Sequence, residues 1–305
     1  MARVLNDRTS VADVAGKLSF RQSPFRKGFS NTSWVFAAIA SLMSLALFDA
    51  HAADLDTIKE RGTLRVAVSP LVPFVIKNDD GTFSGFEIDA VSEFASTQGV
   101  SVEFVETPFC ELADAITEAR TDMVASSYSN IAERRRVLGF SLPYHDTEYY
   151  LVLSRPKQKL AKTLRAVNQK EISIGYQQGG VSGEVAKSEF SGASLKAFSS
   201  FSEIMTAMEN GAIDGAVVFA PYDEMARKFK DPKFSVPHEF PLTRTIEAFA
   251  LDPEAETLRE TLNVWIIEKD LEGYWDDLEE KWFTPENMSD GAEPSVRCKA
   301  LEPTG

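Results

Sequence analysis

A group of hydroxyl side chains stands shortly before an arginine run and could bind an anion. Ser127 and Ser129 follow a short apolar segment, and Arg134 begins a run of three arginines on the helix predicted after them. Hydroxyls and free N–H groups at a helix start favour negative charge, and a nearby arginine can hold a carboxylate through two hydrogen bonds. The pattern therefore predicts a carboxylate site. The alternative is that Ser129 and Asn130 only cap a helix whose arginines face solvent.

A second set of hydrogen-bond donors lies in a glycine-rich turn further along the chain. Gly179 and Gly180 follow a predicted strand, and Val181 leads into a predicted helix that begins near Ser182. N–H groups in the first turn of a helix have no intrahelical partners, so they too can receive an anion. The spacing differs from that of a P-loop and from the G-x-S-x-G turn of serine hydrolases. An ordinary tight turn is the alternative.

Little in the chain would support catalysis or metal binding. His145 and Asp146 are adjacent, so they do not face each other on a regular element, and a surface loop is the favoured interpretation. Neither a zinc-protease motif nor the kinase motifs occur. We expect no catalytic residue, no metal and no cofactor. The three histidines, which lack metal-ligand spacing, are His51, His145 and His238.

The composition is that of a globular protein that avoids polyanions. The chain has 305 residues, of which 44% are hydrophobic and 26% charged, so it can form a core. The length predicts about two domains of roughly 100–150 residues each. Asp and Glu number 46 against 32 Lys and Arg, which gives a net charge of −14. This charge argues against partners such as nucleic acids and anionic membranes.

The N-terminal segment has the pattern of a secretory signal peptide. A basic region precedes the uncharged segment 34–48, and Ala50–Ala52 has the form of a cleavage site. The uncharged segment is shorter than the roughly 20 residues that a membrane span needs. A retained N-terminal anchor is the alternative. We predict that residues 1–52 are removed near Ala52 and that an acidic protein is exported to the periplasm.

Only two cysteines are present, which excludes a disulfide scaffold and a multi-cysteine zinc module. An exported protein meets an oxidising compartment, so Cys110 and Cys298 could pair. The favoured expectation is that they stay apart, because Cys110 precedes a predicted helix and Cys298 lies in a polar tail. No role is assigned to that tail, residues 284–305.

Strand and helix patterns alternate twice along the chain, which predicts two α/β lobes. In such sheets ligands bind outside the carboxyl ends of the strands. The first set of expected elements is strand 64–68, helix 86–99, strand 100–105, helix 112–119 and strand 122–126. The second set is strand 172–176, a helix from about 182, a helix capped by Ser200 and Glu203 that ends at 210–211, and strand 213–219.

Motifs in a fixed order connect these elements to a known family. They are Gly62-x-Leu64-Arg65-Val66, Pro73-Phe74, Gly85-Phe86-Glu87-Ile88-Asp89, Ser127-x-Ser129-x-x-x-x-Arg134, Phe140-Ser141-x-Pro143-Tyr144, Asp214 to Val218 before Ala220-Pro221, and Gly273 before Lys281-Trp282-Phe283. Each motif is weak alone, but their order over about 220 residues is specific. The stretch 64–283 resembles the amino-acid-binding branch of the periplasmic solute-binding proteins, family 3, which serve ABC importers.

The resemblance implies a two-lobed periplasmic-binding-protein fold of type II. Each lobe would be a mixed, mostly parallel sheet flanked by helices, with the ligand cleft between the lobes. Lobe one would be 53–154 plus 248–305 and lobe two 155–247, with crossings near 150–155 and 247–251. The implied partners are a small carboxylate ligand and the permease and ATPase of an ABC importer, and we expect a monomer.

The resemblance also implies a ligand site drawn from both lobes. Arg134, Ser127 and Ser129 would hold a carboxylate from lobe one, and the Val181 N–H and the Ser182 hydroxyl would do so from lobe two. An aromatic wall would form beside them. The eight implied ligand-binding residues are Phe74, Phe109, Ser127, Ser129, Arg134, Val181, Ser182 and Phe219.

Phe219 departs from the family pattern, which places an aspartate there to pair with the ligand's α-ammonium. A buried ammonium without a partner would cost several kcal/mol. Either another acid replaces the aspartate, or the ligand lacks a free α-amine and Phe219 contacts an aromatic, alkyl or quaternary-ammonium group. We therefore predict a carboxylate-bearing solute, an amino acid or a derivative, rather than specifically a plain α-amino acid.

Two other functions fit the same resemblance. One is a ligand-sensing or accessory binding protein, which would need a membrane partner. The other is a periplasmic enzyme similar to the cyclohexadienyl (prephenate/arogenate) dehydratases, which use the same two-lobed fold. We expect a binding protein and not an enzyme.

Overall fold

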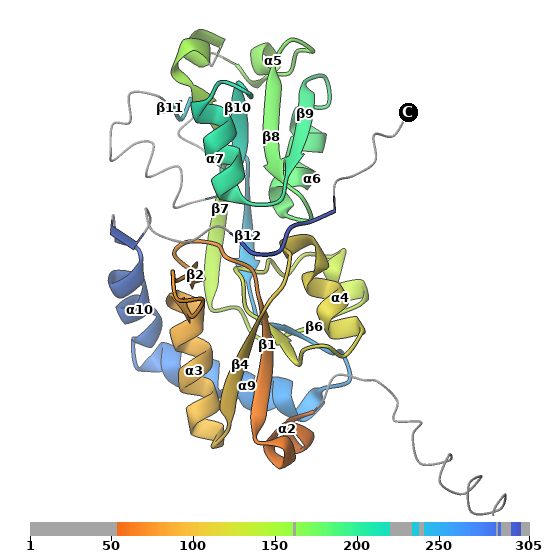
Figure 1. Ribbon diagram of the computed structural model, residues 1–305, viewed down its shortest axis with the longest axis vertical. Coiled ribbons are helices and arrows are strands. Elements are labelled where there is room, and N and C mark those ends of the chain that lie inside the picture. The colour runs from red at the N-terminus through yellow and green to blue at the C-terminus, as the bar shows by residue number, and fades with distance from the viewer. Residues whose placement is uncertain are drawn as a thin grey trace, which may run out of the picture. The chain divides into compact units, whose positions relative to one another are not determined.

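The computed structural model (Figure 1) describes residues 54–160, 163–219, 234–237, 241–284, 286–287 and 294–299. The predicted signal peptide, His51, His238 and Ala220-Pro221 lie outside these residues. These residues form one five-stranded sheet, one six-stranded sheet and a small hairpin of β2 (Ile76–Lys77) and β3 (Phe83–Ser84).

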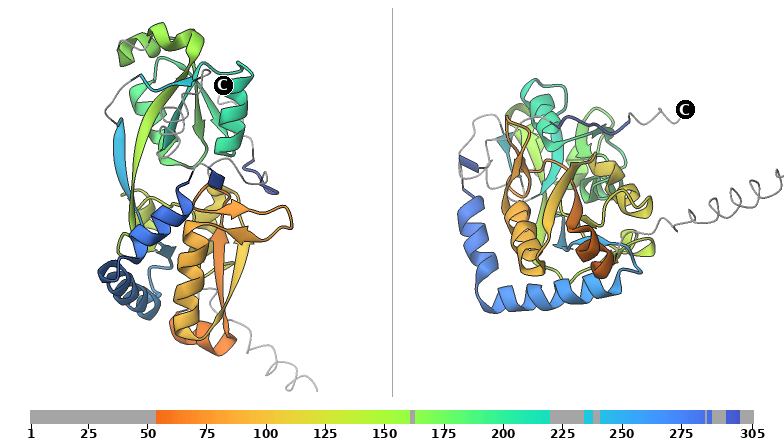
Figure 2. Two further views of the ribbon diagram at one scale, coloured as in Figure 1. Left: turned by 90° about the vertical axis from the view of Figure 1, so that its left-hand side faces the viewer. Right: turned by 60° about the horizontal axis from the view of Figure 1, so that its bottom comes forward.

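The first sheet is built around β1, which contains four fully or nearly fully buried side chains. Its strand order is β4 (Ser101–Glu106), β1 (Thr63–Val68), β5 (Met123–Val124), β13 (Ala250–Leu251) and β6 (Gly139–Phe140). Figures 1 and 2 show α10 alongside α3, with α9 crossing near one end of both. The helices that accompany this sheet are α2 (Leu55–Arg61), α3 (Phe86–Gln98), α4 (Leu112–Thr117), α9 (Glu256–Leu271) and α10 (Tyr274–Trp282).

The second sheet has the order β11 (Phe234–Ser235), β7 (His145–Ser154), β10 (Gly215–Phe219), β8 (Ser173–Gln177) and β9 (Ser194–Phe198), and β12 (Thr243–Glu247) also pairs with β7. Its helices are α5 (Leu164–Val167), α6 (Val181–Glu189) and α7 (Phe201–Glu209). Three 3-10 turns complete the described elements: η2 (Phe109–Glu111), η3 (Arg134–Arg136) and η4 (Arg155–Leu160).

The predicted alternation is confirmed in both halves. β1 pairs in parallel with β4 and β5, and β8 pairs in parallel with β9 and β10. Parallel pairs do not predominate, however, because β7, β12 and β13 run antiparallel to their neighbours. These strands carry the chain from one sheet to the other and back. The sheets are therefore mixed, as predicted, but not mostly parallel.

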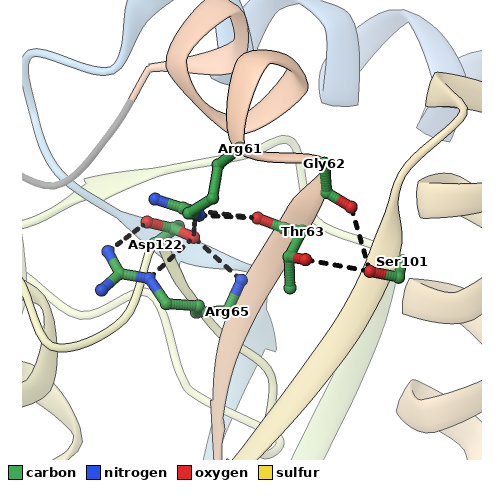
Figure 3. Close-up of polar contacts among 6 residues, drawn as sticks. All are labelled: Arg61, Gly62, Thr63, Arg65, Ser101 and Asp122. Atoms are coloured by element: carbon green, nitrogen blue, oxygen red, sulfur yellow. Dashed lines mark hydrogen bonds and ion pairs between the residues drawn. The ribbon is translucent and has the colours of Figure 1, made fainter.

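In both sheets, an aspartate directly before a central strand accepts hydrogen bonds from a residue of the neighbouring strand. In the first sheet, Asp122 accepts from the Arg65 N–H at 2.8 Å, from the Arg65 guanidinium at 2.8 Å and from Arg61 (Figure 3). In the second, Asp214 accepts from the N–H and the hydroxyl of Ser173, both at 2.9 Å. In each case the aspartate N–H donates back to the same strand residue. The two halves thus repeat each other at the level of single hydrogen bonds.

Cys110 and Cys298 form a disulfide with their Cα atoms 6.0 Å apart, which corrects the expectation that they stay apart. The two residues are 188 positions apart in sequence, so local pattern could not reveal their proximity. The tail returns to the first sheet, where the Ser295 N–H donates to Glu106 at 2.6 Å. This contact brings Cys298 beside η2.

The predicted helix over the arginines is also wrong. Arg134–Arg136 form the single 3-10 turn η3, and the N–H groups of Val137 and Leu138 both donate to the Arg134 carbonyl. β6 begins at Gly139, so the chain between the turn and the strand is too short for a helix.

Candidate functional site

Arg134 is the cation at the centre of the candidate site. Its guanidinium carbon lies 3.6 Å from the centre of the Tyr128 ring and 5.8 Å from that of Phe109. Nη1 donates to the Ser129 carbonyl at 3.0 Å, and Nη2 donates to the Gly179 carbonyl at 2.9 Å. The side chain is buried, whereas Arg135 and Arg136 are exposed. Two predicted anion-binding segments therefore meet at Arg134.

The glycine at position 179 allows the turn before α6 to approach η2 closely. Its φ is +77°, and a Cβ on it would lie 2.7 Å from the Cα of Cys110. A side chain at this position would push the turn before α6 away from η2. The turn delivers Val181 and Ser182, the first two residues of α6, whose N–H groups have no intrahelical partners. The Ser182 hydroxyl oxygen accepts from the Gln177 N–H at 3.0 Å, and its hydrogen remains to be donated.

Ser129 connects Arg134 to a buried acid that the sequence did not single out. The Ser129 hydroxyl donates to Glu247 Oε1 at 3.1 Å, and the Thr245 hydroxyl donates to the same oxygen at 2.8 Å. Burial raises the pKa of Glu247 to about 7, although the Thr245 hydrogen bond and the charge of Arg134 act in the opposite direction. The only sequence signal for Glu247 is a lone acid directly before the apolar run 248–251.

Ser127 belongs to a different polar group. Its N–H donates to Glu87 Oε2 at 2.7 Å, and the Tyr144 hydroxyl donates to the other oxygen of this carboxyl. Burial raises the pKa of Glu87 to about 8 despite these hydrogen bonds. Ser127 has a φ of +45°, in the left-handed region. The structure thus uses the Ser127 N–H inside the protein and does not direct it to the group around Arg134.

The aromatic residues gather at the end of β10. The Phe74 and Phe219 ring centres are 6.1 Å apart, and those of Phe219 and Phe201 are 4.7 Å apart. Phe219 lies opposite Tyr149 in the sheet, and the Tyr149 hydroxyl is 3.5 Å from the Ser129 hydroxyl. Phe74 and Phe219 are therefore brought together, and Tyr149 connects them to the polar group.

His145 is the first residue of β7 and not part of a surface loop, which corrects the interpretation made from its sequence context. It pairs with Glu247 of β12, and its Nδ1 lies 2.9 Å from Glu279 Oε1. Its ring packs against Phe74, with ring centres 5.2 Å apart. The pairing with β12 creates this strand, and the sequence around His145 carries no signal of it.

Neither a metal-binding cluster nor a membrane-spanning helix is present among the residues that the structure describes. No group of three or more His, Cys, Asp or Glu in the described part of the chain could hold a metal ion. Among the same residues, no helix has both the length and the apolar character to cross a membrane.

The arrangement of charges can bind a small zwitterion. Ser129 lies between a guanidinium and a carboxylate, and the start of α6 adds N–H donors near the guanidinium. These groups come from segments that are far apart in the chain, so a molecule that contacts all of them joins the two sheets.

The chain is similar to a family of bacterial binding proteins and to several of its characterised members. The model of bacterial extracellular solute-binding proteins, family 3, matches residues 64–285. The L-cystine-binding protein TcyJ of Escherichia coli (strain K12) is 26% identical over 232 residues, which cover 75% of this chain and 85% of that protein. The cyclohexadienyl dehydratase of Pseudomonas aeruginosa is 24% identical over 259 residues, which cover 84% of this chain and 96% of that protein.

The fold has solved counterparts. The crystal structure of the ancestral amino acid-binding protein AncCDT-1, a precursor of cyclohexadienyl dehydratase, superposes with a TM-score of 0.68. Its sequence is 27% identical, and the match covers 75% of this chain and 99% of that one. This similarity confirms the predicted two-lobed fold.

Proposed function

The chain belongs to family 3 of the bacterial extracellular solute-binding proteins, and we propose that it delivers a small carboxylate-bearing solute to an ABC importer. The observation that carries this proposal is the position of Arg134, which donates to carbonyls of two chain segments, one before η3 and one before α6. Relatives named as binding proteins for cystine and histidine support the class of solute.

Binding would act by closure of the two lobes, which we assign to 53–154 plus 248–305 and to 155–247. A ligand carboxylate would accept from the Arg134 N–H groups that the protein leaves unused and from the N–H groups of Val181 and Ser182. Because the donors lie on both sides, only a ligand that contacts both would shift the population toward the closed form. Phe74, Phe109 and Phe219 would provide the apolar side of the site.

We further propose the cellular setting from the family. The protein would be exported by the signal peptide 1–52, work in the periplasm as a monomer, and present its closed form to a permease that an ATPase drives. Whether the N-terminal segment is removed near Ala52 can be read directly from the N-terminal sequence of the exported protein.

The test of the function compares wild type with Arg134→Lys. Protein expressed from the full-length sequence is screened by thermal shift against the protein amino acids, cystine and small carboxylic acids. We expect at least one carboxylate to raise the melting temperature of wild type by several degrees, and Arg134→Lys to lose most of that shift because lysine cannot form the forked hydrogen bonds of a guanidinium. Arg136→Ala, an exposed neighbour, is the matched control and should keep the shift.

Enzymatic dehydration is the second candidate function. The specific observation that favours it is the similarity to a cyclohexadienyl dehydratase over 84% of this chain. Incubation of the protein with prephenate and with arogenate separates the candidates. Turnover of either acid would support the enzyme, whereas reversible binding without turnover would support the solute-binding function.

A further inference from the structure

Glu247 is a buried carboxylate with only one of its oxygens in use. Oε1 accepts from Ser129 and Thr245, while Oε2 has no hydrogen-bond partner among the described residues. The side chain has no exposed surface. Glu87 is equally buried, but its carboxyl accepts at both oxygens, from the Tyr144 hydroxyl and the Ser127 N–H. An unsatisfied buried carboxylate oxygen is costly, so it points to a donor that arrives from outside the chain.

The charge nearest to Glu247 in the hydrogen-bond network is Arg134, yet the two do not pair. Arg134 donates to the carbonyl of Ser129, and Glu247 accepts from the hydroxyl of the same residue. No ion pair of either residue occurs within the described ranges. Arg134 and Glu247 thus both contact Ser129, and each can still form further hydrogen bonds. An α-amino acid carries its carboxylate and its ammonium on one carbon, and this is the matching arrangement.

Glu247 is connected through Ser129 and Tyr149 to Phe219, the residue that lacks an expected charge. Phe219 is the last residue of β10 and lies opposite Tyr149 of β7. The Tyr149 hydroxyl reaches the Ser129 hydroxyl, which donates to Glu247 at the end of β12. The strands lie in the order β10, β7, β12, and Glu247 pairs with His145, four residues before Tyr149 on β7, so it is linked to the Tyr149 hydroxyl through Ser129. An acid is therefore present, but on a different strand.

We propose that Glu247 is a specificity-determining residue that binds the α-ammonium group of a zwitterionic amino acid while Arg134 binds its carboxylate. This proposal rests on the proposed function and narrows its ligand class from carboxylates to amino acids with a free amine. Glu247 would then take the role of the aspartate that the family pattern has at the position of Phe219.

The experiment is titration calorimetry with matched ligand pairs. Each protein amino acid and cystine is compared with the carboxylic acid in which hydrogen replaces the α-amine, for example phenylalanine with 3-phenylpropanoic acid. The proteins are wild type, Glu247→Gln, and Asp146→Asn as a control. Asp146 pairs with Ile246 on the same two strands, one position from Glu247, and its side chain is 60% exposed. The control thus removes one negative charge from the opposite face.

We expect wild type to bind at least one amino acid, and to bind its amine-free partner at least about 100-fold more weakly. Glu247→Gln should raise the Kd of the amino acid by about 100-fold or more, since it leaves a buried ammonium without its charge partner, and should change the Kd of the amine-free acid by less than about threefold. Asp146→Asn should bind like wild type. A thermal melt of each variant without ligand shows whether it is folded.

The outcomes separate this proposal from the proposed function. If only amine-free acids bind, or if folded Glu247→Gln binds the amino acid as wild type does, the assignment of Glu247 is overturned while the carboxylate-binding function stands. If no carboxylate of either kind binds to wild type, both are overturned. If Glu247→Gln does not fold, Thr245→Val, which removes one hydrogen bond to Glu247, must weaken the binding of amino acids but not of amine-free acids; an equal effect on both overturns the assignment.

Discussion

Asp122 is the residue on which the start of the first sheet depends. Its side chain is fully buried and is contacted by two arginines and a backbone N–H (Figure 3). Asp122→Ala leaves these donors without an acceptor, and we expect the free energy of unfolding to fall by about 3 kcal/mol. The equivalent Asp214 is 21% exposed and holds only Ser173 and Lys157, so Asp214→Ala should cost about half as much. Urea unfolding measures both losses, and equal losses would contradict this difference.

Glu247 should make the ligand-free protein less stable at higher pH. Burial raises its pKa to about 7 from the ordinary 4.5, so between these values the folded protein retains a proton that the unfolded chain releases. The stability contributed by this group therefore falls as pH rises from about 4.5 to 7. At about 1.4 kcal/mol per pKa unit, ionised Glu247 costs on the order of 3 kcal/mol at pH 8.

Glutamine cannot ionise, so Glu247→Gln should melt higher than wild type at pH 8, and the gap should narrow toward pH 5. The other titratable groups that interact with Glu247 are Arg134, His145, Glu87, Tyr144 and Tyr149, and all five are common to both proteins. The difference between the two melting curves therefore isolates Glu247. If the difference in melting temperature does not change across this pH range, the pKa of Glu247 is not raised in the folded protein.

At the scale of single residues, the sequence predicted the groups that carry recognisable motifs and missed those that carry none. Arg134 lies in a buried polar group and Phe219 at the end of β10, and their roles in ligand binding stay predictions. Glu247 was missed because its importance depends on Ser129, which is 118 positions away. Ser127 matched its motif, but a buried carboxyl that pattern cannot detect takes up its N–H.

At the scale of elements, the start of α3 depends on one glycine. Gly85 has a φ of +128°, and a Cβ on it would lie 2.5 Å from the Phe74 carbonyl oxygen. Gly85→Ala should destabilise the protein by more than about 3 kcal/mol, because both the backbone conformation and the contact forbid a side chain. Gly99, at the other end of α3, has a φ of +71° with nothing within 4 Å, so Gly99→Ala should cost only about 1 kcal/mol.

Chemical denaturation of the two alanine variants measures this difference, and similar losses would show that the contact with Phe74 is not what requires glycine at position 85. Because Phe74 packs against Phe219, Gly85→Ala should also weaken ligand binding, whereas Gly99→Ala should not.

α3 and β1 were predicted closely, whereas α9 and β7, the longest helix and strand of the described residues, were not among the expected elements. α3 and β1 have strong periodic patterns with glycine at their ends, so their observed bounds lie within one residue of those expected. The first residues of β7 pair with the distant β12, and β6, which begins soon after η3, pairs with the distant β13; single-sequence patterns do not record such pairing. The antiparallel return strands changed the balance of the sheets for the same reason.

At the scale of the whole molecule, the C-terminal tail contacts elements of both sheets. Ser295 accepts from and donates to groups near β4, and Cys298 is bonded to Cys110 in η2. On the other side, Arg297 forms an ion pair with Glu203 of α7, and the carbonyl of Lys299 accepts from Gln178 at 3.2 Å. Gln178 directly precedes Gly179, whose carbonyl holds Arg134. The tail therefore spans the same pair of segments that the ligand would join.

The disulfide should support ligand binding through this tail. We expect Cys298→Ser to lower the free energy of unfolding by about 3–5 kcal/mol, because the bond closes a very long loop. It should also raise the Kd of the bound solute by about tenfold, because the tail then no longer favours the arrangement in which the two sheets approach each other. Calorimetry and thermal melting measure the two effects. Dithiothreitol should reproduce both effects in wild type and change nothing in Cys298→Ser. A reduced wild type that binds as tightly as the oxidised protein would show that the tail stabilises the fold without acting on the site.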